Sequence, residues 1–312
     1  MNYNMQNQSL EIPKNNYKIL CVGEILWDML PTGPKAGGAP MNVAIHLKKF
    51  GMGAVFTGRV GNDQLGIDLK NFLIRHGLDT NLVQTDYELP TSTVKVHLGE
   101  NHRVNFEIVE NVAWDRLALT NDLQKVAEES NVVVFGTLAS RDSITRETVF
   151  SLLEKCSVKL IDVNLRPPFN KKELVEKLIM RADIAKLNDD ELNYISSWYS
   201  KSYDEKDQIE WFSEKYNCNM VCVTKGENGA VIYSDGQFYE HSGYTVKVAD
   251  TVGSGDAFLA GFLAKYLSGT SLEKTLDFAC ATGALVATKA GGTPDYKLEE
   301  ISLIQRMNMS NQ

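Results

Sequence analysis

Asp256 follows a glycine-rich turn in the stretch 250–264, which reads DTVGSGDAFLAGFLA. Gly253 and Gly255 flank Ser254, so the backbone can turn sharply, and the apolar run that follows predicts a helix. The first amides of a helix lack intrahelical partners and carry the positive end of its dipole, which suits a phosphate. A carboxylate beside them could accept a proton from a substrate hydroxyl. A plain glycine turn with Asp256 as a cap residue explains this stretch equally well.

Small residues recur along the same predicted helix at helical spacing. Ala257, Ala260, Gly261 and Ala264 fall at i, i+3, i+4 and i+7. This stripe predicts a face that packs closely against a sheet rather than a binding surface.

A second group of residues, near residue 30, could hold a polyol. Asp28 could accept hydrogen bonds from hydroxyls, and the pair Gly37-Gly38 could admit a ligand to the backbone beside Asn42. A hairpin turn followed by an Asn on a helix face is the alternative, and the residues alone favour it.

Strands alternate with helices along most of the chain, which predicts a mostly parallel sheet with ligands at the carboxyl ends of its strands. Asn164 and Arg166 follow a predicted strand at 159–162. The rigid fork of Arg166 suits sugar hydroxyls or phosphate oxygens, although a surface ion pair would also explain it.

Two further pairs follow later strands. Asn188 and Glu191 could hold a hydrated magnesium ion, but the same spacing is that of a helix N-cap with Glu at N3, which the residues favour. Thr224 and Gly226 follow the next strand and could border a nucleotide.

Residues 91–98 and 103–108 alternate strongly around a turn at 99–101, which predicts a β-hairpin. With residues 25–35 this hairpin could form a small exposed sheet, and such a sheet in an α/β chain suits a lid. Arg103 and Phe106 on it could reach a ligand, although exposed hairpin residues usually have no specific role.

Composition narrows the function. The chain has 312 residues, 43% of them hydrophobic, and a net charge of −8, which argues against a nucleic-acid or anionic-membrane partner. Five scattered cysteines fit a reducing cytoplasm, and no window approaches a membrane span. Residues 1–16 are polar and predict a frayed tail. There is no GxxxxGK[ST] phosphate loop, so nucleotide use would need another phosphate cradle.

Together these segments resemble the ribokinase-type (PfkB) carbohydrate kinases over about residues 17–305. DTVGSGDAFLAGFL is similar to the second signature of that family, and GGAPMNVAIHLKKFG with GRVGNDQLG is similar to the first. GEILWDMLP, FGTLASR and DVNLRPP resemble bacterial fructokinases. The resemblance implies one ribokinase-like three-layer α/β/α domain at 17–312, with a mostly parallel central sheet. Its small β-sheet lid would be formed by about 24–37 and 90–112.

The resemblance also implies ATP-dependent transfer of phosphate to a primary hydroxyl of a sugar. Asp256 would be the catalytic base, and the amides of Gly253, Ser254 and Gly255 would form an anion hole. Asn188 and Glu191 match an NxxE motif that acts on Mg²⁺ and phosphates. The residues expected to contact sugar are Asp28, Gly38, Asn42, Asn164 and Arg166, with Arg103 and Phe106 as further candidates.

The nucleotide would lie against Thr224, Gly226, Cys280 and Gly283. Family members also bind a monovalent cation such as K⁺ through backbone carbonyls, here expected at Asp250, Val252, Ala287 and Gly292. Met41 stands where many relatives have a small residue, which is a departure beside the sugar site. A homodimer through the lid sheets is common in such proteins.

The leading hypothesis is a fructokinase that makes fructose 6-phosphate. A ribokinase or a 2-keto-3-deoxygluconate kinase is the alternative within the enzyme class. A catalytically silent sugar-binding regulator is the alternative outside it. The intact set of Gly253, Gly255 and Asp256 argues against the regulator, because a sensor has no need of a base.

Overall fold

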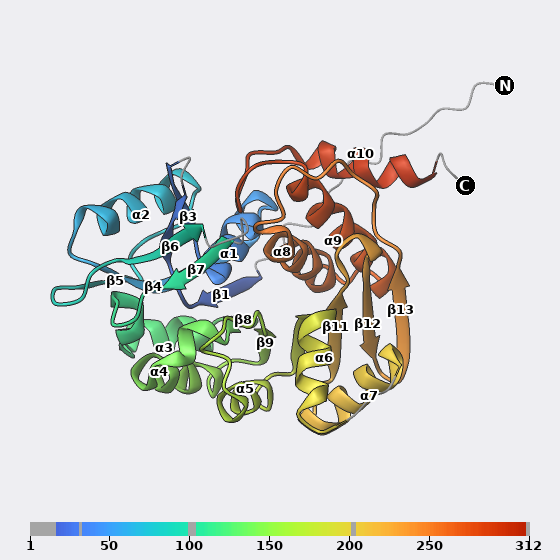
Figure 1. Cartoon of the computed structure of the whole chain (residues 1–312), viewed down its shortest axis with the longest axis horizontal. Helices are drawn as coiled ribbons and strands as arrows, with labels where there is room; N and C mark the ends of the chain where they lie inside the picture. Colours follow the sequence, from blue (N-terminus) through green and yellow to red (C-terminus); the bar gives the residue numbers. More distant parts are fainter. Residues whose placement is uncertain (1–16, 31–32, 99–103, 201–203, 310–312) are drawn as a thin grey trace.

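The computed structural model describes residues 17–30, 33–98, 104–200 and 204–309. A nine-stranded sheet forms its centre (Figure 1). From edge to edge the strands are β13 (Gln237–His241), β12 (Ala230–Ser234), β11 (Met220–Thr224), β10 (Ile184–Asn188), β9 (Val158–Asp162), β8 (Val132–Gly136), β1 (Lys18–Val22), β4 (Gly53–Gly61) and β5 (Val83–Asp86). The strands from β11 to β5 pair in parallel, and β12 and β13 are antiparallel. The predicted mostly parallel sheet is confirmed.

Helices cover both faces of this sheet, which gives three layers (Figure 1). One layer contains α1 (Ala39–Lys49), α8 (Ser254–Leu267) and α9 (Leu272–Ala287), with α10 (Leu298–Met309) packed on α9. The other contains α3 (Asn121–Glu128), α4 (Ser143–Leu153), α5 (Lys172–Ile179), α6 (Asp189–Ser197) and α7 (Glu205–Tyr216). Helix α2 (Gln64–Arg75) contacts β4. Short 3-10 turns are η2 (Ala113–Arg116), η3 (Leu138–Arg141) and η4 (Gly226–Asn228).

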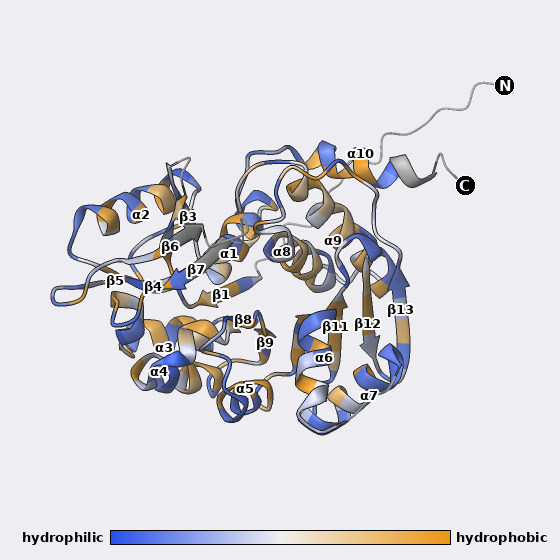
Figure 2. Cartoon of the chain, in the orientation of Figure 1, coloured by the Kyte–Doolittle hydropathy of each residue, from blue (hydrophilic) through white to orange (hydrophobic). Residues whose placement is uncertain are grey.

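The strands have two buried faces because successive side chains point to opposite sides. In β1, Ile19 and Cys21 join the core under α1, α8 and α9, whereas Leu20 and Val22 join the core on the other side. In Figure 2 most of the large sheet is coloured hydrophobic, while the surface helices mix both colours. This pattern explains why the strands read as continuous apolar runs.

A separate four-stranded sheet has the order β3 (Gly33–Gly37), β2 (Leu26–Leu30), β6 (Ser92–Leu98) and β7 (Val104–Ile108). Its β6–β7 pair is antiparallel, as the alternation predicted. Trp27 on β2 donates from Nε1 to the Leu65 carbonyl of α2 at 3.0 Å, and just before β6 the Thr91 amide donates to Asp63 at 2.8 Å. The small sheet is therefore bonded to α2 and to the residue that caps it.

At Gly261 the small-residue stripe of α8 has a helix as its neighbour, where a sheet was expected. A Cβ on Gly261 would lie 2.9 Å from Thr282 Oγ1, so this residue packs against helix α9. A helix of small residues can approach another helix or a sheet equally well, so the stripe could not tell which neighbour it has.

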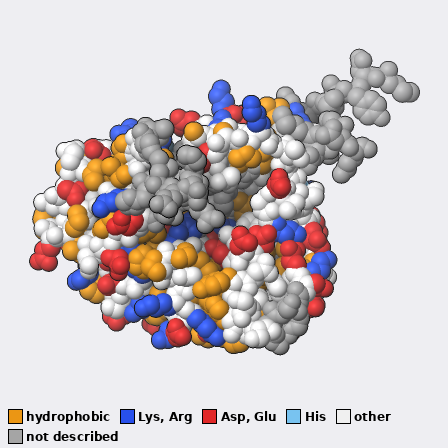
Figure 3. All heavy atoms as spheres, in the orientation of Figure 1, with side chains coloured by type: hydrophobic (Ala, Val, Ile, Leu, Met, Phe, Trp, Pro, Cys, Tyr) orange, Lys and Arg blue, Asp and Glu red, His pale blue; other side chains and the backbone are white. Residues whose placement is uncertain are grey.

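On the face drawn in Figure 3, acidic and basic side chains are interspersed. All five cysteines are buried and free. Within the described ranges, none of the helices combines the length and the apolar character needed to cross a membrane.

Candidate active site

Helix α8 begins at the glycine turn that the sequence singled out. Gly253 is its N-cap with φ +74°, and Asp256 is the third residue of the helix. No side chain caps this helix end. The Asp256 carboxylate, 9% exposed, accepts a hydrogen bond from Asn42 Nδ2 at 2.8 Å, across 214 residues of sequence. Asp256 thus contacts another part of the fold instead of acting as a simple cap.

The glycines of the turn are needed for space. A Cβ on Gly253 would lie 2.4 Å from Gly292 Cα, and a Cβ on Gly255 would lie 3.2 Å from Lys186 Nζ. The Ser254 amide donates to the Thr251 carbonyl at 3.3 Å, so this member of the expected anion hole has a partner already. The Gly255 distance also shows that the Lys186 ammonium lies next to the turn.

Lys186 is the main functional candidate that the sequence analysis did not single out. It pairs with Asp162 at 3.0 Å, and both side chains are less than 10% exposed. Burial alone would lower the pKa of Lys186, but the charges of Asp162, Glu191 and Asp256 raise it above its ordinary value. The ammonium stays charged, which suits a site that stabilises phosphate oxygens.

The environment of Asp256 raises its pKa to about 6. Burial is the largest cause, and the negative charge of Asp162 adds to it. The Asn42 hydrogen bond and the charges of Lys186 and Arg166 act in the opposite direction. A carboxylate with such a pKa is ionised at neutral pH and is a better proton acceptor than an ordinary Asp.

The expected sugar residues converge on the same region. Asp28 is half-buried on β2, and a Cβ on Gly37 would lie 2.5 Å from its Oδ2. Burial raises the pKa of Asp28 to about 6, although the positive charge of Arg166 acts to lower it. Gly38 has φ +126°, and a Cβ there would lie 2.3 Å from the Glu24 carbonyl. Both glycines of the pair are therefore required by close approach.

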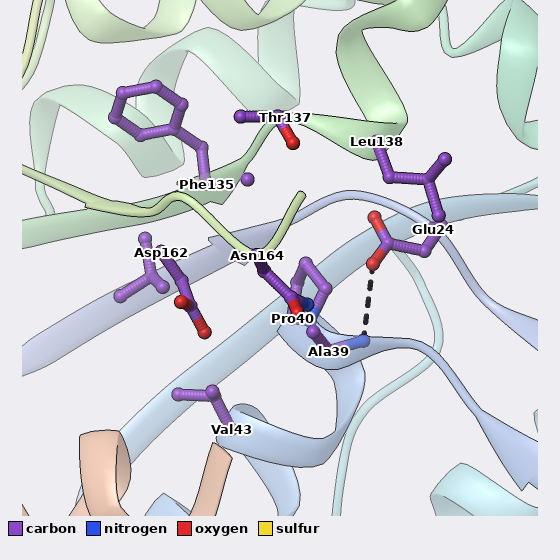
Figure 4. A pocket seen from close by; sticks show the side chains of 11 residues that line it. Glu24, Ala39, Pro40, Val43, Phe135, Thr137, Leu138, Asp162 and Asn164 are labelled. Atoms are coloured by element: carbon purple, nitrogen blue, oxygen red, sulfur yellow. Dashed lines mark hydrogen bonds between the residues drawn. The ribbon is translucent and has the colours of Figure 1, made fainter. Parts of the chain in front are cut away.

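A small cavity of about 10 Å³ lies between these segments (Figure 4). Glu24, Asp162 and Asn164 line it, and Glu24 Oε1 accepts from the Ala39 amide at 3.2 Å. Five buried side-chain oxygens have no hydrogen-bond partner among the described residues, and three of them belong to this region: Glu24 Oε2, Asn42 Oδ1 and Asp162 Oδ2. Buried acceptors of this kind need an explanation, and ligand hydroxyls or bound water would supply one.

Asn188 and Glu191 form the capping box of α6. Asn188 Oδ1 accepts from the Glu191 amide at 2.8 Å, and Glu191 Oε2 accepts from the Asn188 amide at 2.9 Å. Glu191 Oε1 also accepts from the Leu165 amide at 2.6 Å, which ties α6 to the loop of Asn164 and Arg166. The helix-cap interpretation is confirmed. The magnesium role stays a prediction.

The expected nucleotide residues lie around the next strand end and α9. Thr224 pairs in register with Asn188, and Gly226 has φ +55°. A Cβ on Gly283 would lie 3.1 Å from the Ser254 carbonyl, and Cys280 is buried one turn earlier on α9. Gly283 thus lies against the start of α8, and Thr224 ends the strand next to Asn188.

The expected cation residues also lie together. The Asp250 carboxylate accepts from the Val252 and Gly291 amides, each at 3.0 Å. The Ala287 carbonyl accepts from the Ala249 amide at 2.8 Å and from the Asp250 amide at 3.2 Å, and the Gly292 carbonyl is bonded to His46. Cation binding at these carbonyls stays a prediction.

Two sugar candidates cannot be placed. Arg103 lies outside the described residues, and Phe106 belongs to β7 but its side chain lies outside the description. Their roles remain predictions.

Glu24, Asp162 and Lys186 are buried charged residues of this region that the sequence analysis left out. A signal existed, because a charged residue inside a strand with two buried faces rarely occurs without a partner. In the strand IAKL, Lys186 comes two residues after Ile184, so both side chains point to the same face of the sheet. That face is the one covered by α8.

Comparison with known proteins agrees with this geometry. The sequence matches the pfkB family carbohydrate kinases over residues 32–298, which is most of the chain. The chain belongs to the pfkB family of carbohydrate kinases. This pfkB kinase is 30% identical over 294 residues to a fructokinase of Escherichia coli, with 88% of this chain and 94% of that protein covered.

Two further relatives extend the match. A probable fructokinase-7 of Arabidopsis thaliana is 28% identical, with 93% of each chain covered. The structure of a fructokinase from Xylella fastidiosa with bound ATP superimposes with a TM-score of 0.83 at 25% identity, covering 94% of this chain and all of that one. The expected ribokinase-like fold, and the resemblance to sugar kinases of the pfkB family, are confirmed.

Proposed function

We propose that this pfkB kinase transfers the γ-phosphate of ATP to the primary hydroxyl of a ketohexose, with D-fructose as the substrate and fructose 6-phosphate as the product. The observation that carries the proposal is Asp256, buried in the first turn of α8 beside the glycine turn and the Lys186 ammonium. The names of the fructokinase relatives and the ATP in one related structure support the choice of sugar and donor.

The chemistry requires little from the base itself. Phosphoryl transfer passes through a loose transition state, so alignment and charge stabilisation supply most of the rate enhancement. Asp256 would orient the acceptor hydroxyl and take its proton late, a role worth about 10²–10⁴-fold. Lys186 and the amides of Gly253 and Gly255 would stabilise the transferring phosphoryl group, whereas the Ser254 amide is bonded to the Thr251 carbonyl.

The sugar would lie between the two sheets. Asp28 and Asn164 would accept hydrogen bonds from its hydroxyls, and Arg166 would donate to its oxygens. Gly38 would let the sugar approach the backbone next to Asn42. The four-stranded sheet would act as the lid that excludes water, which otherwise competes as the acceptor.

Magnesium fits the site only through water. Both Glu191 oxygens already accept backbone hydrogen bonds, so Glu191 and the free Asp162 oxygen would hold waters of a hydrated ion. Bound Mg²⁺ would neutralise charge on the phosphates. K⁺ at the carbonyls near Asp250 and a homodimer through the lid remain part of the proposal.

Coupled ADP-release assays on the wild-type protein test this function. The panel contains D-fructose, D-ribose, 2-keto-3-deoxygluconate, D-glucose and fructose 6-phosphate, each with Mg·ATP. We expect kcat/KM to be highest for D-fructose. A maximum for ribose or for the sugar acid would identify one of the other two kinases, and sugar binding without any ADP release would identify a regulator.

A further inference from the structure

His46 lies on α1, one helical turn after Asn42, so the two side chains project from the same side of the helix. Both are buried, with 0% and 5% of their surfaces exposed. Asn42 contacts Asp256, while His46 Nε2 lies 2.9 Å from the Gly292 carbonyl oxygen. One turn of α1 thus contacts both the proposed base and the loop behind the glycine turn.

The hydrogen bonds of His46 determine its tautomer. A carbonyl oxygen can only accept, so Nε2 carries the hydrogen, and Nδ1 accepts from the Tyr296 hydroxyl at 2.8 Å. The two rings stack with an interplanar angle of 19°. Burial lowers the pKa of His46 to about 4, so the ring is neutral at neutral pH. Both of its nitrogens are therefore engaged in one fixed orientation.

Gly292 fills the space between the turn and the base. A Cβ on Gly253 would lie 2.4 Å from Gly292 Cα, and a Cβ on Gly292 would lie 2.9 Å from Asn42 Nδ2. The Asp250 carboxylate, which is bonded to the amides of Val252 and Gly291, joins the same two loops. A shift of Gly292 must therefore move the glycine turn, Asn42 or both.

We propose that His46 is a positioning residue for phosphate transfer, which holds the Gly292 carbonyl and so fixes the glycine turn relative to the Asn42–Asp256 pair. This inference rests on the proposed function, because it assigns the geometry of that same site. A His46 that only fills the core would affect stability alone. A His46 that positions the turn affects the γ-phosphate step while sugar binding is retained.

The test compares four variants. His46→Leu removes both hydrogen bonds of the ring. His46→Gln keeps an N–H donor, because the amide nitrogen of Gln is as many bonds from Cα as Nε2 of His is. Gly292→Ala leaves His46 intact but adds a methyl group against Asn42. His76→Leu is the matched control, because this histidine bonds only its own helix end at Phe72 among its described contacts. Each variant is assayed for kcat and for sugar KM, with thermal unfolding as the check on folding.

We expect kcat to fall at least about tenfold in His46→Leu and Gly292→Ala, because small displacements in an aligned site are costly. The KM for the sugar should stay within about twofold of the wild-type value, because the contacts that bind the sugar equally in the ground state and the transition state are unchanged. His46→Gln should recover most of kcat, and His76→Leu should match the wild type. Wild-type kcat in a folded His46→Leu protein would overturn the proposal, whatever Gly292→Ala shows. If His46→Leu does not fold, His46→Asn, whose shorter side chain withdraws the N–H from the Gly292 carbonyl, decides in its place.

A binding measurement separates this inference from the proposed function. Calorimetry measures the affinities for Mg·AMP-PNP, which carries a γ-phosphate, and for Mg·ADP, which lacks one. The difference between them reports on the γ-phosphate site without turnover. We expect Gly292→Ala and His46→Leu to weaken Mg·AMP-PNP at least about fivefold while Mg·ADP changes less than about twofold. Equal weakening of both nucleotides, or of neither, would refute the role of His46. Failure of the proposed function would instead appear as a wild-type protein that releases no ADP with any sugar.

Discussion

At the scale of single residues, the proposed reaction predicts that activity depends on pH through Asp256. The proposed base must be ionised, and burial together with the charge of Asp162 raises its pKa to about 6. Activity is therefore retained above this pKa and lost as the pH falls through it. We expect kcat/KM to be flat near neutrality and to fall about tenfold per pH unit below about pH 6. A pH–rate profile at saturating Mg·ATP measures this.

Asn42→Ala provides the second half of that test. The Asn42 hydrogen bond lowers the pKa of Asp256, so its loss should move the acid limb of the profile to higher pH. A limb that stays in place, or that moves to lower pH, would contradict this account of the Asp256 environment.

Lys186 leads to a prediction about stability and activity together. Lys186→Met leaves the Asp162 carboxylate buried without its partner, which should lower the free energy of unfolding by about 3–5 kcal/mol. The double variant Lys186→Met/Asp162→Leu removes both charges, so we expect most of that stability to return. Urea denaturation of the two variants measures the difference.

Turnover should not return in the double variant, because it lacks both the ammonium beside the glycine turn and the Asp162 carboxylate proposed to hold magnesium-bound water. Recovery of both stability and turnover would mean that Lys186 only neutralises Asp162. The matched control is Lys159→Met, at the surface pair with Asp183 at 3.6 Å, which should cost about 0–1 kcal/mol.

At the scale of elements, helix α6 depends on its capping box. Asn188→Ala removes the acceptor for the Glu191 amide, so we expect the free energy of unfolding to fall by about 1 kcal/mol. Asn188→Ser keeps a capping oxygen and should recover most of the loss. Urea denaturation checks both values. An Asn188→Ala protein as stable as the wild type would show that the cap contributes nothing.

Sequence patterns predicted most elements for a physical reason. The strands of the large sheet are buried on both faces, so apolar runs such as 132–136 stand out, and the β6–β7 hairpin alternates clearly. Other elements were not predicted. Helix α7 mixes charged and aromatic residues, and β13 is a polar edge strand with little burial, so neither shows a strong period.

The candidate site was predicted only in part because its residues interact across long separations. The sequence signals of turns and helix starts lie within a few neighbouring residues. The glycine turn at Gly253 and Gly255 and the Asn188–Glu191 capping box could therefore be predicted from short segments. The contacts of Asp256 with Asn42 and of His46 with Gly292 span 214 and 246 residues. No local pattern encodes such contacts, and only the packing of α1 against α8 brings them together.

At the scale of the whole molecule, parallel strand order assembles the site. The carboxyl ends of β1, β9 and β10 lie at one edge of the sheet and deliver Glu24, Asp162 and Asn188 to it. The start of α8 faces the same edge with Asp256. The four-stranded sheet is bonded to the neighbouring α2 region through Trp27 and Thr91. In the proposed function, the acceptor sugar would lie between Asp256 and this sheet.

The central claim is that Asp256 accepts the proton of the acceptor sugar. The most direct measurement compares Asp256→Asn with the wild type for kcat and for D-fructose affinity, with Asp68→Asn on α2 as the matched control. We predict that kcat falls about 10²–10⁴-fold while the fructose Kd changes less than about twofold. Near-normal turnover in a folded Asp256→Asn protein would contradict the account.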